Sequence, residues 1–245
     1  MQYEFAPLEG ITGYIYRNAH HACFPSMDRY YTPFITPKKG KSFTTREWND
    51  IAAEHNQNIA VVPQILTNQA EGFCKVAGMP KEQGYEEVNL NLGCPSKTVV
   101  TKGCGAGFLD RPEELERFLD EIFAKCNIQI SVKTRLGMED ASGFPELMKL
   151  YNKFPMKELI IHPRVQKDFY KNTPNLEMFA EAFAMSTNPV CYNGDIFCVE
   201  DHQRICERFP ALDAVMRGRG KLTNPALARE IRGGTALTKA ELRTF

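Results

Sequence analysis

The sequence has no long hydrophobic run, no Cys-x-x-Cys pair and no excess of charge of either sign. A helix that spans a bilayer needs ~18–20 mostly apolar residues in a row, so we expect no membrane segment. The 30 basic and 30 acidic side chains balance to a formal net charge of zero, which excludes a surface that is basic throughout. The first residues also lack the charged and apolar regions of a secretory signal. We therefore expect a cytoplasmic protein.

Eight cysteines are present, but nothing in their spacing indicates a disulfide framework or a zinc site. In a chain without a secretion signal, free thiols in a reducing compartment are the simplest interpretation. The histidines show no metal-ligand spacing either, so we predict no metal site. A length of 245 residues with 43% hydrophobic residues is enough for one large buried core.

Apolar segments of strand length recur along the chain and alternate with segments of helical periodicity. The clearest helix is Pro112–Lys125, which places Leu115, Phe118 and Ile122 on one face and has proline at its start. Weaker helical patterns cover residues 203–209 and 224–231. We predict eight strands, at residues 3–8, 29–35, 59–65, 87–92, 128–135, 158–162, 189–193 and 213–217.

Eight strand–helix alternations in ~250 residues favour a closed (β/α)8 TIM barrel of the α/β class. An open doubly wound sheet is the alternative. That fold is expected to have a GxGxxG turn after its first strand, and the sequence has no such motif there. Barrels of this kind carry their active sites at the carboxyl ends of the strands. Unusual polar residues collect at those ends of the predicted strands: Glu9, Gln64, Asn91, Cys94, Lys133, Arg135, His162, Arg164, Asn193, Asp195, Arg217 and Arg219.

Lys133 lies in the fifth predicted strand, where alternation places Val132 on the helix side and Lys133 in the lumen. A lysine inside a barrel needs a partner or a ligand, because an unpaired buried charge is costly. Either Lys133 pairs with a carboxylate as a structural element, or it binds a ligand. His162, at the end of the next strand, is interpreted as a donor to an electron-rich ligand.

Two glycine-containing turns follow the last two predicted strands. Asn193, Gly194 and Asp195 form the first, and Gly218 and Arg219 belong to the second. Glycine allows backbone N–H groups to approach a ligand closely, and arginine binds phosphate through two hydrogen bonds. Because barrels often hold a phosphate at these two loops, the pair predicts a phosphorylated cofactor or substrate.

Cys94 follows the fourth predicted strand in a glycine-rich loop. A thiol at this place can act as a proton donor or nucleophile, with its pKa set by nearby charges. The structural alternative is a small buried side chain. Cys104, ten residues later, has no comparable position and is interpreted as structural.

Six motifs in this order resemble the tRNA-dihydrouridine synthase family of flavoproteins. They are APLEGIT with Arg17, NLGCP with the following KGCGA, VKTRLG, HPR with Tyr170, NGDI and MRGRG, spread over residues 6 to 225. The resemblance implies an FMN-dependent barrel that reduces uridine in tRNA to 5,6-dihydrouridine, with NADPH as electron donor. Hydride would reach C6 of the uracil, and Cys94 would deliver the proton to C5.

The resemblance also implies roles for individual residues. Cys94 is the catalytic acid. Pro7, Leu8 and Glu9 border the isoalloxazine ring, and Gln64, Lys133 and His162 face its polar edge. The phosphate lies on Asn193, Gly194, Asp195, Gly218 and Arg219, and the uridine on Asn91, Arg164 and Tyr170.

Members of this family usually continue into a helical domain that binds tRNA. We therefore assign residues 1–235 to the FMN-binding barrel and residues 236–245 to the start of a C-terminal helical domain that is absent or truncated. We expect a monomer whose partner is tRNA. Two alternatives stay open: a Schiff-base lyase that uses Lys133, and another FMN barrel that reduces a small molecule.

Overall fold

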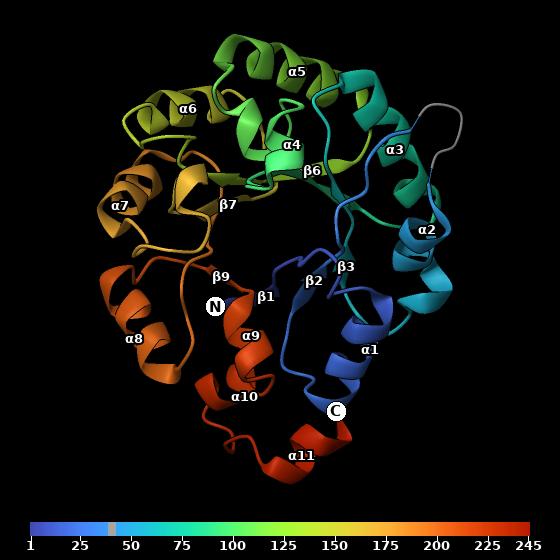
Figure 1. Cartoon of the computed structure of the whole chain (residues 1–245), viewed down its shortest axis with the longest axis vertical. Coiled ribbons are helices and arrows are strands. Elements are labelled where there is room, and N and C mark those ends of the chain that lie inside the picture. The colour runs from blue at the N-terminus through green and yellow to red at the C-terminus, as the bar shows by residue number, and fades with distance from the viewer. Residues whose placement is uncertain (39–42) are drawn as a thin grey trace.

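Parallel strands form the centre of the molecule and helices surround them, as Figure 1 shows. The computed structural model describes residues 1–38 and 43–245. The strands are β1 (Gln2–Phe5), β2 (Arg29–Tyr31), β3 (Val61–Val62), β4 (Gln64–Ile65), β5 (Glu87–Leu92), β6 (Gln129–Arg135), β7 (Leu159–His162), β8 (Val190–Tyr192) and β9 (Ala214–Arg217). The helices are α1 (Tyr14–Cys23), α2 (Thr45–Ile51), α3 (Ala70–Glu82), α4 (Lys97–Val100), α5 (Pro112–Lys125), α6 (Phe144–Tyr151), α7 (Leu176–Met185), α8 (Val199–Arg208), α9 (Arg219–Thr223), α10 (Leu227–Ile231) and α11 (Lys239–Thr244).

The sheet closes into a barrel through one interrupted strand. Its order is β3-β2-β1-β9-β8-β7-β6-β5-β4, and β3 and β4 are the two halves of the third predicted strand. Pro63 separates the halves because proline has no N–H group for the ladder. Its carbonyl still accepts a hydrogen bond of 2.8 Å from the Asn89 N–H, and a bridge joins Ile35 to Ile65. The predicted (β/α)8 barrel is confirmed, with this break as the one departure in strand count.

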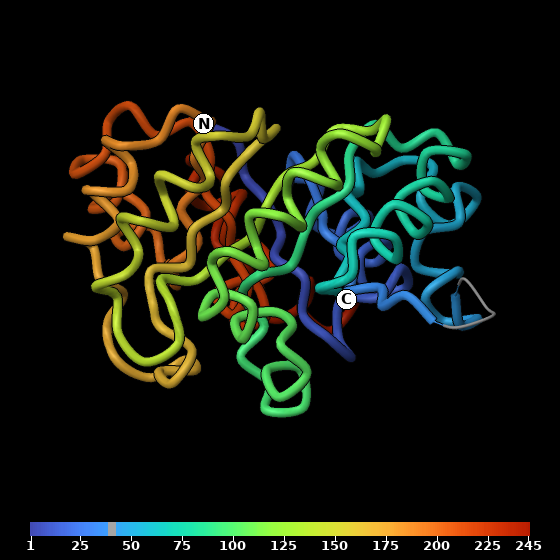
Figure 2. The backbone as a smooth tube through the Cα atoms, turned by 90° about the horizontal axis from the view of Figure 1, so that it is seen from above, coloured from blue at the N-terminus to red at the C-terminus, as the bar shows by residue number. Residues whose placement is uncertain are grey.

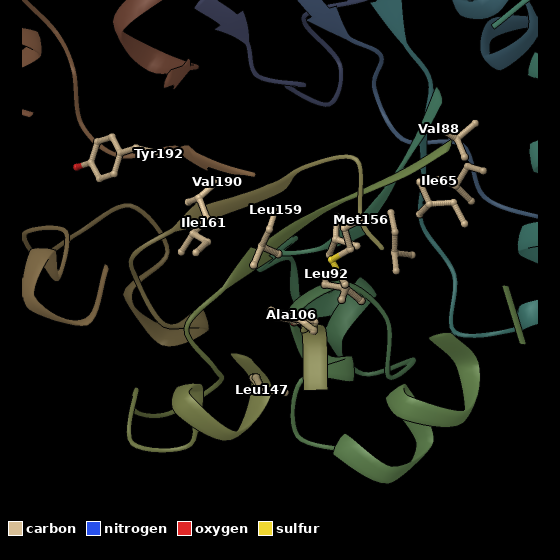
Figure 3. Close-up of a cluster of buried hydrophobic side chains, with 14 of the residues drawn as sticks. Ile65, Val88, Leu92, Ala106, Leu147, Met156, Leu159, Ile161, Val190 and Tyr192 are labelled. Carbon is tan, nitrogen blue, oxygen red and sulfur yellow. The ribbon is translucent and has the colours of Figure 1, made fainter. Parts of the chain in front are cut away.

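Alternation along the strands separates the lumen from the layer beneath the helices. In β5, Val88 and Leu92 belong to the main apolar core, whereas Asn89 and Asn91 are hydrogen-bonded to residues in the lumen. Figure 3 shows this core where strand residues such as Leu159 and Ile161 lie near Leu147 of α6 and Ala106. A smaller apolar cluster fills the lumen itself: Ala6, Tyr31, Val62, Ile160, Cys191, Ala214 and Met216.

Helix α5 has the bounds that the sequence predicts. Pro112 occupies its first turn, and Glu113 and Glu114 favour the positive end of the helix dipole. Leu115 and Ile122 are fully buried against the barrel, which stabilises the fold by about 1.5–3 kcal/mol for each side chain.

The predicted helix at residues 224–231 is wrong in its extent. Helix α9 ends before this range, at Thr223, and α10 begins only at Leu227. Pro225 lies between them, and a proline disfavours helical conformation in the residue before it. The first strand is also shorter than predicted, so residues 6–8 form part of a loop instead.

The amino-terminal end of the lumen is closed by a cluster of charged side chains. Arg29 forms ion pairs with Glu4, with Glu87 (2.8 Å) and with Glu158 (3.1 Å). The Tyr31 hydroxyl donates to Glu158 over 3.4 Å. Burial, and then the neighbouring Glu4 carboxylate, raise the pKa of Glu158 to about 9. Charged and polar side chains therefore close this end of the barrel.

Helix α11 lies beside α1 and α10 at the edge of the barrel (Figure 1). Its first turn is capped by Thr238, whose hydroxyl accepts from the Glu241 N–H over 3.2 Å. The Phe245 ring packs with its centroid 5.5 Å from that of Tyr16. The assignment of residues 236–245 to a second domain stays a prediction. Among the described residues, no helix has the length and hydrophobicity to cross a membrane.

Candidate active site

A pocket opens at the carboxyl ends of the strands and collects most of the predicted site residues. Its lining includes fourteen of the fifteen: Pro7, Leu8, Glu9, Gln64, Asn91, Cys94, Lys133, His162, Tyr170, Asn193, Gly194, Asp195, Gly218 and Arg219. Arg164 is the exception. Figure 2 shows the green segment around residue 100, which follows Cys94, projecting from the body of the molecule.

Asn91 holds the loop that carries Cys94. Its Oδ1 atom accepts from the N–H groups of Gly93 (3.0 Å) and Cys94 (2.9 Å). The Cys94 carbonyl in turn accepts from the Ala106 N–H over 3.1 Å. Gly105 has a φ of +55°, and a Cβ there would lie 2.8 Å from the Cys94 carbonyl oxygen. Glycine is therefore required where the loop turns back under the thiol.

A ladder of amide side chains supports Asn91 from below. The Asn91 Nδ2 atom donates to Gln64 Oε1, and Gln64 Nε2 donates to Asn89 Oδ1, each over 2.8 Å. Asn89 Nδ2 then donates to the Ser131 hydroxyl over 2.9 Å. Because all four side chains are buried and paired, the ladder fixes Asn91 and, through it, the position of Cys94.

Cys94 is partly buried, and burial raises the pKa of its thiol. The nearby positive charges of Arg135 and Lys133 act in the opposite direction. The group is thus a protonated thiol at neutral pH. A thiolate formed there would lie close to two cations.

Lys133 extends from β6 into the pocket and donates to no protein acceptor within residues 1–38 and 43–245. Of the two alternatives for Lys133, pairing with a carboxylate is not found among the described residues, because their ion pairs do not include it. Burial and the adjacent Arg135 lower the pKa of Lys133 to about 7. An amino group in this state is ready to bind an electron-rich ligand.

Arg135 stabilises the pocket mouth by joining the loop after β5 to the loop after β7. Its guanidinium donates to the carbonyls of Gly93 (2.9 Å), Val165 (3.0 Å) and Phe169 (2.7 Å). The group is 1% exposed and lies 5.5 Å from the centroid of the Tyr170 ring. The sequence placed Arg135 at a strand end but gave it no site role, although its alternation with Lys133 was a usable signal.

Arg164 lies beneath the pocket, and the prediction that it contacts the substrate is corrected. It is 1% exposed, and its guanidinium donates to His162 Nε2 (3.1 Å), to the Asn172 carbonyl and to both carboxylate oxygens of Asp195. With its donors used inside the protein, Arg164 orients its neighbours.

Because arginine only donates, Nε2 of His162 accepts and Nδ1 carries the ring hydrogen. Burial and surrounding cations hold the pKa of His162 well below its usual range, so the ring is neutral.

Asp195 links two arginines at the pocket edge. Its carboxylate accepts from Arg164 and, over 2.5 Å, from Arg219 Nη2. A carboxylate repels a phosphate, so the side chain of Asp195 acts by orienting Arg219 rather than by binding the anion. Asn193 connects the loop after β8 to β9 at the same edge, by donating to the Met216 carbonyl over 2.9 Å.

The turns after β8 and β9 come into direct contact. A Cβ on Gly220 would lie 2.0 Å from the Ile196 carbonyl oxygen, so only glycine permits this approach. Within the described parts of the chain, the N–H groups of Gly194, Gly218 and Arg219 donate to no protein acceptor. Two adjacent turns with unused N–H groups and an arginine are suited to bind an anion, and we call them the anion-binding edge.

Arg217 points away from the pocket. It is 1% exposed and lies over the Tyr3 ring, 4.4 Å from its centroid. The Tyr3 hydroxyl lies 3.4 Å from His202 Nε2 on α8, so this arginine belongs to the layer between strand and helix. Of the two arginines in the MRGRG turn, Arg219 is the one that faces the site.

The outer rim of the pocket is aromatic. The guanidinium of Arg219 lies 4.9 Å from the centroid of Tyr170 and 5.4 Å from that of Phe197. Tyr170 and Phe197 are exposed. Sequence reasoning missed Phe197 and also Phe34, which both line the pocket, because neither residue has a polar group or a motif that marks it.

The loop after β1 is fixed from behind by residues of the APLEGIT motif. The Leu8 N–H donates to the Thr12 hydroxyl over 2.8 Å, and Arg17 donates to the Thr12 carbonyl over 2.9 Å. Arg17 is fully buried and also approaches Asp50 at 3.6 Å. These two motif residues are therefore structural, and they hold Pro7, Leu8 and Glu9 at the pocket.

Two relatives found by sequence comparison are named tRNA-dihydrouridine(16) synthases. The chain is 29% identical over 238 residues to a tRNA-dihydrouridine(16) synthase of Cupriavidus necator, covering 93% of this chain and 72% of that protein. It is 30% identical over 239 residues to the enzyme of the same name from Pseudomonas syringae pv. tomato, covering 94% and 74%.

Solved structures confirm the fold. An old yellow enzyme homologue from Zymomonas mobilis superposes with a TM-score of 0.68 at 13% identity, over 99% of this chain and 91% of that one. A morphinone reductase gives a TM-score of 0.69 at 12% identity, over 99% and 89%. The sequence model of the dihydrouridine synthase (Dus) family matches residues 4–242. Since that match spans nearly the whole chain, this protein belongs to the dihydrouridine synthase family.

Proposed function

We propose that this protein reduces uridine in tRNA to 5,6-dihydrouridine, with FMN in the pocket, NADPH as reductant and Cys94 as proton donor. The observation that carries the proposal is the placement of the Cys94 thiol: Asn91 holds its loop at the pocket that Lys133 enters from the neighbouring strand. Membership of an oxidoreductase family supports the class of reaction.

The residues present fit FMN. Its phosphate needs hydrogen-bond donors, and the unused N–H groups of Gly194 and Gly218 together with Arg219 supply them. The polar edge of its ring needs a cation or donor, and the amino group of Lys133 and the Nδ1 hydrogen of His162 are available. When bound, FMN supplies the hydride that goes to C6 of the uracil.

Cys94 completes the reduction by giving its proton to C5 of the uracil. Its raised pKa keeps the thiol protonated before the reaction. The thiolate that remains is stabilised by the positive charge of Arg135 and of Lys133. A positioned general acid of this kind contributes roughly 10²–10⁴-fold to the rate.

The substrate uridine must leave the base stack to enter this pocket, because the reacting thiol lies below the rim. Asn91 and Tyr170 line the pocket and are the proposed contacts of the extruded base. Exposed aromatic rings at the rim suit stacking with nucleotides.

Replacing Cys94 with alanine tests the proton donor. We expect the variant to bind FMN and to be reduced by NADPH, while dihydrouridine formation falls by ~10²-fold or more. The measurement is nucleoside mass spectrometry of unmodified tRNA after incubation with enzyme. Cys104→Ala is the matched control, since Cys104 is in the same loop and its Sγ is directed to the Lys102 carbonyl, at 3.8 Å. Normal turnover by Cys94→Ala would reject the assignment.

Replacing Arg219 with alanine tests the cofactor. Losing one charge-assisted hydrogen bond should weaken FMN retention by about 1.5–3 kcal/mol. The measurement is flavin fluorescence during titration of the flavin-free protein. Arg208→Ala removes an equally exposed arginine on α8, whose partner is Glu177, and should leave FMN affinity unchanged. A protein that takes up no FMN at all would contradict the cofactor proposal.

Two other activities make different predictions for the same protein. A lyase would form a Schiff base on Lys133, whose pKa of about 7 suits a nucleophile, and borohydride would then trap a carbonyl substrate on it. A reductase of small molecules would reduce an activated alkene faster than it reduces tRNA. We expect neither result.

A further inference from the structure

Two cysteines outside the pocket lie against each other. Cys74 is in α3 and Cys126 directly follows α5, and their Sγ atoms are 2.9 Å apart. Both are partly buried, so small reagents can reach them. Across residues 1–38 and 43–245, no other two thiols make such a contact.

We propose that Cys74 and Cys126 form a reversible disulfide that joins α3 to α5. The sulfur atoms need to approach by only about 0.9 Å to reach the ~2.05 Å of a disulfide bond. The helices that carry them already pack together, with the rings of Phe73 and Phe118 in edge contact at 6.0 Å between centroids. The bond therefore requires no rearrangement of the fold.

The chemistry is thiol–disulfide exchange with a low-molecular-weight disulfide such as oxidised glutathione. The Cys74 thiolate attacks one glutathione sulfur and releases one reduced glutathione. The Cys126 thiolate then attacks the Cys74 sulfur of the mixed disulfide and releases the second. Both protein thiols are oxidised, and one glutathione disulfide is reduced to two thiols.

The order of attack follows from the local geometry. The Cys126 thiol donates its hydrogen to Cys74, so Cys74 is the acceptor and the better initial nucleophile. Burial and the neighbouring sulfur raise the pKa of Cys126 to about 12, which keeps it protonated until the mixed disulfide forms.

The bond would enclose the part of the chain that carries the catalytic loop. Cys74 and Cys126 are 52 positions apart, and β5, Cys94 and α5 lie between them in sequence. Neither cysteine lines the pocket. The disulfide should therefore stabilise the scaffold around the site without taking part in the chemistry.

The test is to incubate the flavin-loaded protein with oxidised glutathione, alkylate the remaining thiols, digest without reductant and map disulfides by mass spectrometry. We expect a peptide pair linked through Cys74 and Cys126 that lacks the two thiol hydrogens. The melting temperature should rise by roughly 5–10 °C, the scale for closing a loop of this length in a domain of this size. Dithiothreitol should reverse both changes. Cys74→Ser and Cys126→Ser should abolish them, and Cys104→Ser should not.

A glutathione adduct that persists on either cysteine, a different pairing, or recovery of both thiols in alkylated form would overturn the proposal. Mapping of the unsubstituted protein gives this answer even where a serine variant folds poorly. The outcome is independent of the proposed function, because dihydrouridine formation is measured separately and does not require the disulfide.

Discussion

Lys133 and Arg135 lie two positions apart in β6 at the pocket mouth, and they differ in their hydrogen-bond partners. Arg135 gives its hydrogens to three backbone carbonyls, whereas Lys133 has no acceptor among the described residues. Burial and then the positive charge of Arg135 lower the pKa of Lys133 to about 7, below its usual 10.5. The folded state then holds this proton less tightly than the unfolded chain does. The charge of Lys133 therefore costs stability below pH 7, and the cost disappears as the pH rises from 7 to about 10.5.

Lys133→Met should make the flavin-free protein more stable at pH 6. Removing an unpaired charge from a partly buried position should raise the free energy of unfolding by about 1–3 kcal/mol, and the difference should shrink above pH 9. Urea unfolding at both pH values measures it. The same substitution should weaken FMN binding. Lower stability of the variant at pH 6 would mean that a partner holds the lysine.

At the scale of elements, the anion-binding edge depends on how closely two turns approach. Gly220 lies against the Ile196 carbonyl, where a methyl group has no room. Gly78, in α3, is the opposite case: it is exposed, and a Cβ there would meet no atom within 4 Å. Alanine at these two positions should therefore change the stability of the protein in opposite directions.

Gly220→Ala should destabilise the protein by about 1–3 kcal/mol, the usual cost of overpacking a close contact, and should reduce FMN affinity by separating the two turns. Gly78→Ala should instead stabilise it by roughly 0.5–1 kcal/mol, because alanine suits a helix interior better. Thermal unfolding and flavin titration of both variants check this. If both substitutions had the same sign, the contact at Ile196 would not be the cause.

The sequence was sufficient for the barrel and for the residues at its strand ends, because period-two alternation directly reports which side chains enter the lumen. It was insufficient for Arg164, since nothing local shows that Asp195 and the Asn172 carbonyl use its donors. It was also insufficient for Phe197 and for the Cys74–Cys126 contact. These depend on how segments distant in sequence pack, and no short pattern encodes that.

At the scale of the whole molecule, the barrel carries an acidic cluster at the end opposite the pocket. Three carboxylates surround Arg29 there, and Glu158 has its pKa raised to about 9 from a usual 4.5. The folded state thus binds this proton more tightly than the unfolded chain does. The stabilisation of the fold by this protonated carboxyl group is fully present below pH 4.5 and is lost as the pH rises towards 9.

Glu158→Gln should remove this pH dependence, because glutamine resembles the protonated acid at every pH. Between pH 6 and 8 the natural protein should lose about 1–3 kcal/mol of stability relative to the variant. Urea midpoints at the two pH values measure the change. Glu146→Gln, at a side chain that is 73% exposed, should show no such trend. Parallel pH profiles for the natural protein and Glu158→Gln would contradict the assigned pKa.

The pairing of β1 with β9 has a consequence for how the protein is made. Glu4 is opposite Met216 in that pair, so the ring closes only when residues 2–5 and residues 214–217 meet. The pocket has the same requirement, because Pro7 and Gly220 both line it. A nascent chain on the ribosome has no complete binding site until residue 220 has emerged. Cofactor loading must therefore follow synthesis of the chain through residue 220, and fragments released earlier can neither retain the cofactor nor close the barrel.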